Sequence, residues 1–178
     1  PGVRPPQPKG VTELSYANSV KWPESKGPDK YRRGLYIFFQ RTVPYPQLMT
    51  FDSPDAVLAC SRRQRSTTPL QALNLLNDPV FLEAAQALGV RLLNEERGTF
   101  EDRMKLAFRL CLNRDPKPKE VTALRGAFDK QATLLRSDGE EAAFLHPQTI
   151  NGATPEEGGA WTIMARVLMN LDEFLHRE

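Results

Sequence analysis

Four dipeptides constrain the fold of this chain more than any other feature, because each places a capping residue directly before a proline. They are Ser53-Pro54, Thr68-Pro69, Asp78-Pro79 and Thr154-Pro155. A proline at the first helical position lacks an N–H that the helix could not use, and the preceding side-chain oxygen accepts from unpaired N–H groups of the first turn. Thr68 with Gln71, and Thr154 with Glu157, also have the spacing of a capping box, although two glycines after Glu157 leave open a simple turn there. Each dipeptide predicts a helix start.

Apolar residues recur with helical spacing in three segments after residue 80. The three faces consist of Phe81, Ala84, Ala85, Leu88 and Leu92; of Phe100, Met104, Ala107 and Cys111; and of Val121, Leu124, Phe128 and Leu135. Residues at this spacing share one side of an α-helix, so each segment predicts an amphipathic helix. No segment alternates apolar and polar residues as a half-buried strand does. The sequence therefore predicts an all-α fold, an irregular helical bundle.

The last segment, residues 160–178, is apolar on nearly all sides. One stripe consists of Trp161, Met164, Leu168, Leu171 and Leu175, and a second beside it of Ile163, Val167 and Phe174. A helix with two apolar stripes is typically buried, so we predict that this one is central to the bundle. The preceding residues, 137–159, are polar and glycine-rich, which predicts a long surface loop.

Ten of the 15 prolines fall within residues 1–70. Since proline removes a backbone donor and biases its predecessor toward extended conformations, we predict that residues 1–30 are an irregular arm wrapped over the bundle, anchored by Tyr16, Val20 and Trp22. Residues 31–42, YRRGLYIFFQRT, fit a short helix or a buried strand; we predict a helix, ended by residues 43–46.

The length of 178 residues fits one domain, residues 1–178, with helices over 31–136. The opening PGVRPPQPKG has the composition of an internal loop, so we expect the C-terminal fragment of a larger domain. Two cysteines, Cys60 and Cys111, leave open a disulfide, free thiols or outside partners; apolar neighbours favour buried thiols.

The net charge of +2 conceals an asymmetry along the chain. Residues 1–70 hold 11 Lys or Arg and 5 Asp or Glu, a net charge of +6, whereas residues 71–178 hold 13 and 17, a net charge of −4. A basic front suggests an acidic neighbour, most simply the back of the same chain. Near-neutral overall charge argues against nucleic-acid binding. No apolar run approaches 18 residues, so no membrane span is predicted.

Two carboxylates, Asp52 and Asp55, precede a cluster of arginines. The pair could ligate a hard cation or act in acid/base catalysis. Calcium loops normally supply three or more oxygen ligands, and an Asp beside arginines more often orders a loop through ion pairs. We therefore assign both to a supporting polar network and predict no metal site; the sequence indicates no catalytic residue.

Six arginines form a candidate surface for anions or for a protein partner. They are Arg32, Arg33, Arg41, Arg62, Arg63 and Arg65. Guanidinium groups match phosphate, sulfate and carboxylate oxygens two at a time. The interleaved aromatics Tyr31, Tyr36, Phe38, Phe39 and Tyr45 are also found in nucleic-acid and sugar binders, but a core needs the same residues.

Side-chain amides form the last candidate group. Gln71, Asn74 and Asn77 follow Thr68 at three-residue intervals, which predicts a polar ridge on one short helix. Buried amides must be paired, so we expect the ridge to fix the neighbouring loop rather than to contact substrate. The two histidines, His146 and His176, lack partners at ligand spacing, and without a CxxCH motif the chain carries no covalent haem of its own.

Four stretches together resemble a planctomycete domain of unknown function, the C-terminal domain of large secreted proteins that also carry a cytochrome c domain. They are RRGLYIFFQRTVPYP, FDSPD, RRQRSTTPLQALNLLNDPVFLEAAQALG and NLDEFLHRE. The family elements fall on Arg32 to Tyr36, Phe51 to Asp55, Cys60 and Thr68 to Leu73. Departures are Lys117, where the family usually has Thr, and the ending Asp172 to Leu175. The resemblance covers most of residues 2–178.

The resemblance implies an extracytoplasmic protein, periplasmic or secreted, in a bacterium. It implies haem c in another domain of the parent polypeptide, no cofactor in this chain and no catalytic residue. The implied partners are the rest of that polypeptide, namely the upstream half-domain and the haem c domain.

Two functions remain open. The first is a non-catalytic helical module that presents its Arg and aromatic front to a partner domain or an anionic glycan. The second is part of an extracytoplasmic redox enzyme that holds acidic or sulfated glycans with its Arg/Asp face. The module requires Arg62, Arg63 and Arg65 to be paired with internal carboxylates and carbonyls. The enzyme requires at least two of them to point into a concave pocket with the carboxylates.

Overall fold

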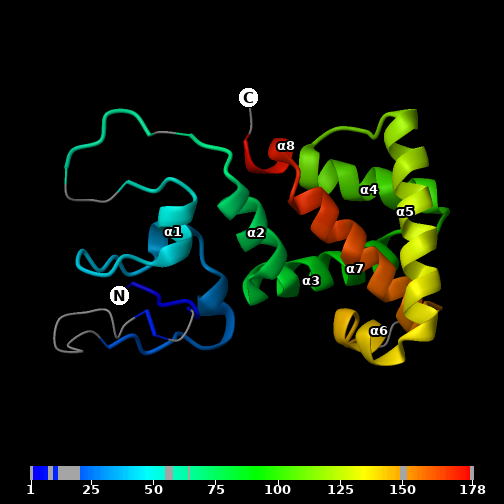
Figure 1. Cartoon of the computed structure of the whole chain (residues 1–178), viewed down its shortest axis with the longest axis horizontal. Coiled ribbons are helices and arrows are strands. Elements are labelled where there is room, and N and C mark those ends of the chain that lie inside the picture. Colours follow the sequence, from blue (N-terminus) through cyan, green and yellow to red (C-terminus); the bar gives the residue numbers. More distant parts are fainter. Residues whose placement is uncertain are drawn as a thin grey trace. The chain divides into compact units, whose positions relative to one another are not determined.

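The computed structural model describes residues 2–7, 10–11, 21–54, 58–63, 65–148 and 152–176 (Figure 1). Within these ranges the chain forms α-helices, two short 3-10 helices and no strand, which confirms the predicted all-α fold. The elements are η3 (Gly27–Tyr31), η4 (Gly34–Tyr36), α1 (Pro46–Thr50), α2 (Pro69–Asn77), α3 (Pro79–Glu95), α4 (Phe100–Leu112), α5 (Pro118–Ser137), α6 (Gly139–Leu145), α7 (Pro155–Met169) and α8 (Asp172–Leu175).

The chain divides into two compact units, residues 1–71 and 72–178, which we call unit 1 and unit 2. The boundary falls inside α2, directly after Gln71. One domain over residues 1–178, with its arm wrapped over the bundle, stays a prediction. The predicted anchors Tyr16 and Val20 lie outside the described residues.

Unit 2 is built around α7, as the sequence predicts. Trp161, Met164 and Leu168 of this helix are at most 1% exposed. The helix packs mainly against α3, α5 and α6 and less extensively against α4 and α8 (Figure 1). The Trp161 ring lies 5.3 Å from the Phe100 ring and 5.1 Å from the Phe128 ring, so aromatic residues of α4, α5 and α7 meet in the core.

The predicted helix over 160–178 is wrong at its C-terminal end. α7 ends at Met169, Leu171 adopts an extended conformation with φ −74° and ψ 142°, and the short helix α8 follows. Three acceptors, the carbonyls of residues 166–168, share the N–H of Asn170 at this end. The second apolar stripe is also incomplete, because Val167 is 39% exposed.

The predicted surface loop over 137–159 is wrong for most of its length. It contains all of α6 and the first turn of α7. Asp138 starts α6 by accepting from the Glu141 N–H at 3.0 Å, and Ala142 and Leu145 bury their side chains in the core. Glycine-rich composition suggested a loop here, whereas Gly158 in fact permits close packing.

Gly158, in the first turn of α7, lies directly against His146. A Cβ atom at this glycine would fall 2.3 Å from the Cγ and Cδ2 atoms of the imidazole. His146 is 6% exposed, and neither ring nitrogen has a hydrogen-bond partner. Burial lowers the pKa of His146 because it disfavours the charged imidazolium.

Three of the four predicted helix starts are confirmed. α2, α3 and α7 begin at the predicted prolines, and the Thr68, Asp78 and Thr154 side chains accept from N–H groups of the first turn at 3.2, 2.9 and 3.3 Å. Local capping chemistry is sufficient at these positions.

The predicted start at Ser53-Pro54 is wrong in the described residues, because neither residue is helical. The helix α1 instead begins at Pro46, where we expected a helix to end. After α1 the chain reverses at Asp52, which has a left-handed φ of 57°, and the Ser53 N–H bonds back to the Leu48 carbonyl at 2.8 Å. Residues 55–57, over which the predicted helix would have continued, lie outside the described residues.

The predicted helix over residues 31–42 is also wrong. The segment forms the end of η3, then η4, and then an extended stretch in which Ile37 makes a parallel bridge with Val3. The Val3 N–H donates to the Tyr36 carbonyl at 2.8 Å, and the Phe38 N–H donates to the Val3 carbonyl at 2.7 Å. A pairing partner more than thirty residues away decided this segment.

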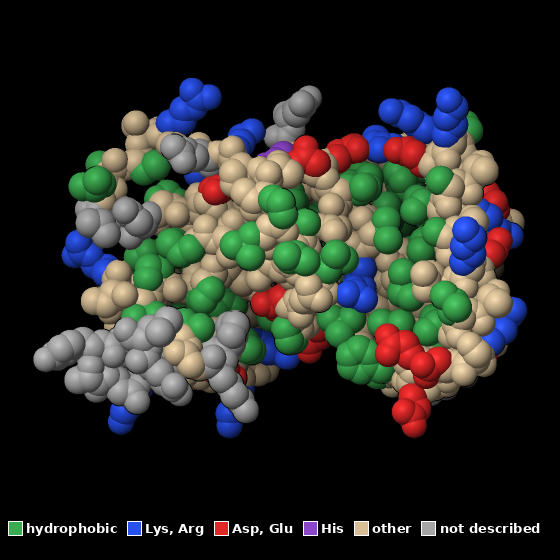
Figure 2. All heavy atoms as spheres, viewed as in Figure 1, with side chains coloured by type: hydrophobic (Ala, Val, Ile, Leu, Met, Phe, Trp, Pro, Cys, Tyr) green, Lys and Arg blue, Asp and Glu red, His purple; other side chains and the backbone are tan. Residues whose placement is uncertain are grey.

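Arginine and carboxylate side chains are paired across the surface of unit 2. Arg114 bonds Glu120 at 2.8 Å and Glu173 at 2.7 Å, which links the start of α5 to α8. Along α5, where Arg125 lies 3.5 Å from Asp129, side chains of both signs alternate (Figure 2). On this face of unit 1 the visible charges are mostly Lys and Arg.

Both cysteines are free thiols, but only one is buried as expected. Cys60 is exposed, whereas Cys111 on α4 is 6% exposed in the core of unit 2. Burial raises the pKa of the Cys111 thiol to about 11.

Candidate functional site

Asp52 is the centre of the polar network in unit 1. Its left-handed backbone directs the carboxylate toward Ser66, whose N–H and hydroxyl both donate to it at 2.8 Å. The Gln71 amide donates a third, longer bond of 3.4 Å. These bonds hold the end of α1 against the segment that leads into α2.

Gln71 completes the network from the first turn of α2. Its side chain is 2% exposed, and its Nε2 donates to the Thr50 carbonyl at 2.9 Å and to the Ser66 hydroxyl at 3.2 Å. Its Oε1 accepts from the Thr68 N–H at 3.0 Å, which closes the predicted capping box. One amide therefore caps a helix and fixes the preceding loop.

Two hydrogen bonds from Ser66 lower the pKa of Asp52, the one from its hydroxyl more than the one from its N–H. The hydrogen bond from Gln71 and the positive charge of Arg63 lower it further. The carboxylate is therefore ionised at neutral pH and accepts hydrogen bonds. The hydrogen bonds from Ser66 and Gln71 already use this carboxylate to order the loop before α2, which favours a structural role.

Arg63 closes the same loop through backbone carbonyls. Its Nε donates to the Asp52 carbonyl at 2.8 Å, and its terminal nitrogen donates to the Phe51 carbonyl. Beside it lies a shallow pocket of about 490 Å³, lined by Met49, Leu58 and Arg62 as well as by Asp52 and Arg63.

The remaining predicted residues lie in separate contacts. Arg32 bonds Asp29 at 2.8 Å, and the guanidinium groups of Arg32 and Arg33 each lie 5.8 Å from the Tyr36 ring. Arg41 and Arg65 are exposed, and Asp55 lies outside the described residues. Of the three arginines that separate the two functions, Arg63 is paired with carbonyls and Arg62 lines the pocket, so neither requirement is met in full.

Asn74 and Asn77 do not share the partners of Gln71. The Asn77 amide is exposed and donates to the Leu73 carbonyl, and the buried Oδ1 of Asn74 has no hydrogen-bond partner. An α-helix turns about 100° per residue, so each three-residue step falls about 60° short of a full turn. Over two steps Asn77 rotates away from the side that Gln71 uses.

Ser66, which contributes as much to the network as Gln71, is not predicted from the sequence. No motif marks a lone serine, and only its place two residues before the Thr68 cap suggested proximity to the helix start. The module hypothesis anticipated that Arg63 pairs with internal carbonyls, but the sequence does not indicate which ones, because every residue supplies a carbonyl.

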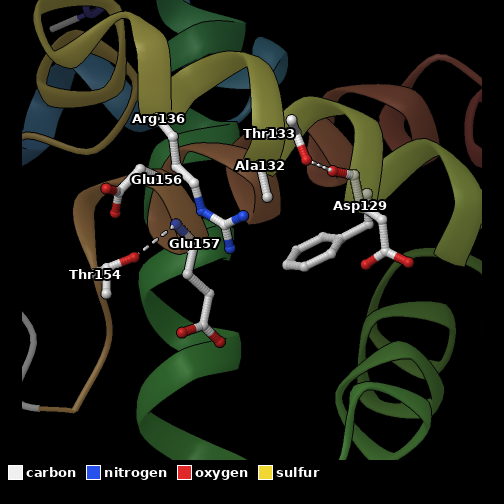
Figure 3. Close-up of a pocket in the computed structure, with 8 residues that line it drawn as sticks. Asp129, Ala132, Thr133, Arg136, Thr154, Glu156 and Glu157 are labelled. Atoms are coloured by element: carbon white, nitrogen blue, oxygen red, sulfur yellow. Dashed lines mark hydrogen bonds between the residues drawn. The ribbon is translucent and has the colours of Figure 1, made fainter.

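A second pocket, of about 470 Å³, lies in unit 2 between α5 and the start of α7 (Figure 3). Arg136 extends from α5 toward Glu157, while Asp129 lies at the other end. Glu157 is already paired with Arg103 at 2.6 Å. A hydrogen bond from the Thr154 side chain and one from its own backbone N–H lower the pKa of Glu156, and the Arg136 charge contributes less. The sequence did not indicate this pocket, because its lining residues lie up to 29 positions apart.

Neither a metal-binding cluster nor a membrane-spanning helix is found in the described part of the chain. No group of three or more His, Cys, Asp or Glu side chains in that part could hold a metal ion. None of its helices is long and apolar enough to cross a membrane.

Replacing Gln71 with leucine should destabilise unit 1. The change leaves the Thr50 carbonyl without its Gln71 donor and removes the 3.4 Å bond to Asp52, and an acceptor left unpaired costs about 1–3 kcal/mol. Urea unfolding followed by Trp22 fluorescence in a Trp161→Phe background measures unit 1, since the chain has only these two tryptophans. The control Asn77→Ala removes an exposed amide and should change stability by less than about 0.5 kcal/mol. Equal effects of the two substitutions would contradict the network.

Comparison with known proteins leaves the activity open and assigns the family. No curated protein and no solved structure matches the chain. Residues 1–128, well over half of the sequence, match the family PSD1, described as "Protein of unknown function (DUF1553)". The chain therefore belongs to the DUF1553 family of proteins of unknown function.

Proposed function

We propose that this chain is a non-catalytic helical interaction module of a secreted bacterial multidomain protein. In this proposal it docks onto the rest of its parent polypeptide, the upstream half-domain and a domain that carries haem c. Its family membership fits a module without an assigned reaction. The extracytoplasmic location and the haem partner follow from the sequence resemblance, and the docking surface follows from unit 1.

One observation carries the proposal: large apolar side chains stand out from a basic segment. Tyr31, Leu35 and Tyr36 are 56%, 83% and 45% exposed, and Arg32 and Arg33 lie between them. We call residues 31–36 the YRRGLY surface. Tyrosine and arginine dominate the energetics of protein interfaces, and an exposed leucine among them gains most by being covered.

The charge of unit 1 indicates the sign of the partner. Residues 1–71 carry a net charge of +6. Lys30 lies 4.6 Å from the Tyr31 ring, and two guanidinium groups lie over Tyr36, so cationic groups surround the exposed rings. An acidic patch on the partner would complement this surface and steer association.

The Asp52 network supports docking over catalysis. The two charged groups best placed to hold a substrate, Asp52 and Arg63, are engaged with Ser66 and with backbone carbonyls. Using them on a ligand would break the bonds that order the loop between α1 and α2. The YRRGLY surface needs no such rearrangement.

A double charge reversal tests the proposal. Arg32→Glu with Arg33→Glu should weaken binding to the separately produced upstream part of the parent polypeptide at least tenfold, measured by calorimetry at physiological salt, because each reversal adds like-charge repulsion at the interface. The control Arg97→Glu with Lys119→Glu makes the same change in net charge at exposed positions of unit 2. It should change the affinity less than about threefold if, as for rim charges, the effect is local.

Equal losses from both pairs would show unspecific attraction and contradict the proposal. Titration with chondroitin sulfate tests whether the surface binds a sulfated glycan instead of a protein. If this sulfated glycan binds the wild-type chain, the Arg32/Arg33 pair abolishes that binding, and the upstream polypeptide does not bind, then a glycan and not a protein is the partner.

A further inference from the structure

A proline-rich segment of unit 1 lies against three aromatic side chains. Residues 3–6, Val-Arg-Pro-Pro, contact Trp22, Phe38 and Tyr45. Val3 and Pro5 are buried, whereas Arg4 and Pro6 are partly exposed. The segment is held at every residue, although it belongs to no helix.

Two of the aromatic residues bind consecutive proline carbonyls. The Trp22 Nε1 donates to the Pro5 carbonyl at 2.8 Å, and the Tyr45 hydroxyl donates to the Pro6 carbonyl at 2.9 Å. The two rings are stacked with an interplanar angle of 2° and centroids 5.8 Å apart. The adjacent Trp22 and Tyr45 side chains thus donate to two successive carbonyls of one peptide segment.

Residues before the prolines fix the direction of the segment. The Arg4 guanidinium lies 4.2 Å from the Phe38 ring centroid, a cation–π contact. The Arg4 N–H donates to the Ser25 hydroxyl at 2.9 Å, and the Ser25 N–H donates to the Arg4 carbonyl at 2.7 Å. A reversed segment would lose these bonds and the Val3 bridge.

This combination matches the chemistry by which proteins recognise polyproline II helices. Each residue before a proline is biased toward an extended conformation, and a polyproline II segment leaves its carbonyls without internal partners. Grooves lined by aromatic residues exploit such preformed segments, with flat rings against the proline rings and polar donors on the carbonyls. An arginine next to the prolines adds orientation.

We propose that Trp22, Phe38 and Tyr45 form a recognition groove for arginine-containing proline-rich peptides, and that residues 3–6 occupy it as a tethered ligand. The resident segment competes at an effective concentration on the order of millimolar, as short tethers do. A free peptide therefore binds measurably once the resident segment is weakened. This proposal does not rest on the proposed docking by the YRRGLY surface.

The test uses the full chain and a peptide with the sequence of residues 3–7, Val-Arg-Pro-Pro-Gln. The variant Val3→Asp with Arg4→Glu weakens the resident segment without substituting any of the three groove residues. Titration of this variant should shift the Trp22 indole N–H resonance to saturation, with at least tenfold higher affinity than in the wild-type chain. The Trp161 indole serves as the internal control.

Two controls separate groove recognition from unspecific contact. The peptide Val-Arg-Ala-Ala-Gln should bind at least tenfold more weakly, because alanine lacks the preformed conformation. Adding Tyr45→Phe to the variant removes the donor to the Pro6 carbonyl, keeps the Trp22 reporter and should lower the affinity to a similar extent. Equal binding of both peptides would overturn the proposal, as would no saturable shift at millimolar peptide.

A second variant keeps the test decisive if the charge substitutions unfold unit 1. Pro5→Ala with Pro6→Ala retains both carbonyls and the Arg4 contact but loses the conformational bias. The Val-Arg-Pro-Pro-Gln peptide should displace this weakened segment. A folded Pro5→Ala/Pro6→Ala chain that does not bind the peptide would overturn the proposal.

Discussion

Replacing Trp161 with alanine is expected to lower the free energy of unfolding of unit 2 by about 3–5 kcal/mol, the usual cost of removing a large aromatic side chain from a core. Trp161 is 1% exposed and lies between the Phe100 and Phe128 rings. Its removal therefore opens a cavity where α4, α5 and α7 meet. Urea unfolding followed by circular dichroism at 222 nm measures the loss, because unit 2 holds most of the helix.

Two substitutions calibrate this result. Val167→Ala changes a 39% exposed residue on the same helix and should cost less than about 1 kcal/mol, since little apolar area is lost. Trp161→Phe keeps an aromatic ring and removes an indole N–H that has no acceptor, so it should cost clearly less than alanine. A Trp161→Ala loss as small as that of Val167→Ala would contradict the central position of α7.

The second large effect is expected from Gly158→Ala, which should destabilise unit 2 by about 1–3 kcal/mol, the usual range for overpacking a core. The added methyl group would fall 2.3 Å from the imidazole of His146, itself buried and in contact with the first turn of α7. The control is Gly126→Ala in α5, where no atom lies within 4 Å of the new Cβ. Because alanine is the better helix former, this control should stabilise the protein by up to about 1 kcal/mol.

The same chemical change should thus have opposite signs at two helical glycines, measured as shifts in the urea midpoint. A double-mutant cycle with His146→Ala measures the coupling free energy between positions 146 and 158. In the Gly158→Ala background, removing the imidazole should remove the steric overlap. Additive losses from the two substitutions would mean that His146 is not the obstacle.

Sequence reasoning succeeded where a structure depends on neighbouring residues. The capping oxygens of Thr68, Asp78 and Thr154 act within three residues, so spacing alone located the starts of α2, α3 and α7. The spacing of apolar residues also located much of the core, such as Leu92 and Met104, although Ala84 of the predicted faces is exposed. The Thr68 and Gln71 capping box could be predicted on this basis.

Sequence reasoning failed where a residue far away in the sequence determines the local backbone conformation. Ser53-Pro54 has the same local chemistry as the successful starts, but Asp52 is held by Ser66, 14 residues away, and the chain turns instead. Residues 31–42 contain helix-compatible spacing, yet hydrogen bonds to Val3 extend the chain at Ile37 and Phe38. Neither Ser66 nor the carbonyls that bind Arg63 carry a sequence signal.

The glycine-rich entry to α7 shows a different limit. Glycine near a helix start normally suggests a loop, because it lowers helix propensity. At Gly158 the missing side chain instead admits His146, so the glycine belongs to the core. Composition cannot distinguish these two roles without knowledge of the opposing residue.

Because the two thiols differ in burial, thiol labelling can report opening of the core without any substitution. A thiol-specific alkylating reagent should modify Cys60 at once, because this thiol is exposed. Its labelling serves as an internal control for the activity of the reagent. Cys111 is shielded within α4, and its raised pKa leaves little reactive thiolate, so its labelling must wait for transient opening of the helix bundle. The delay between the two labelling events therefore reports how often the interior of unit 2 becomes accessible.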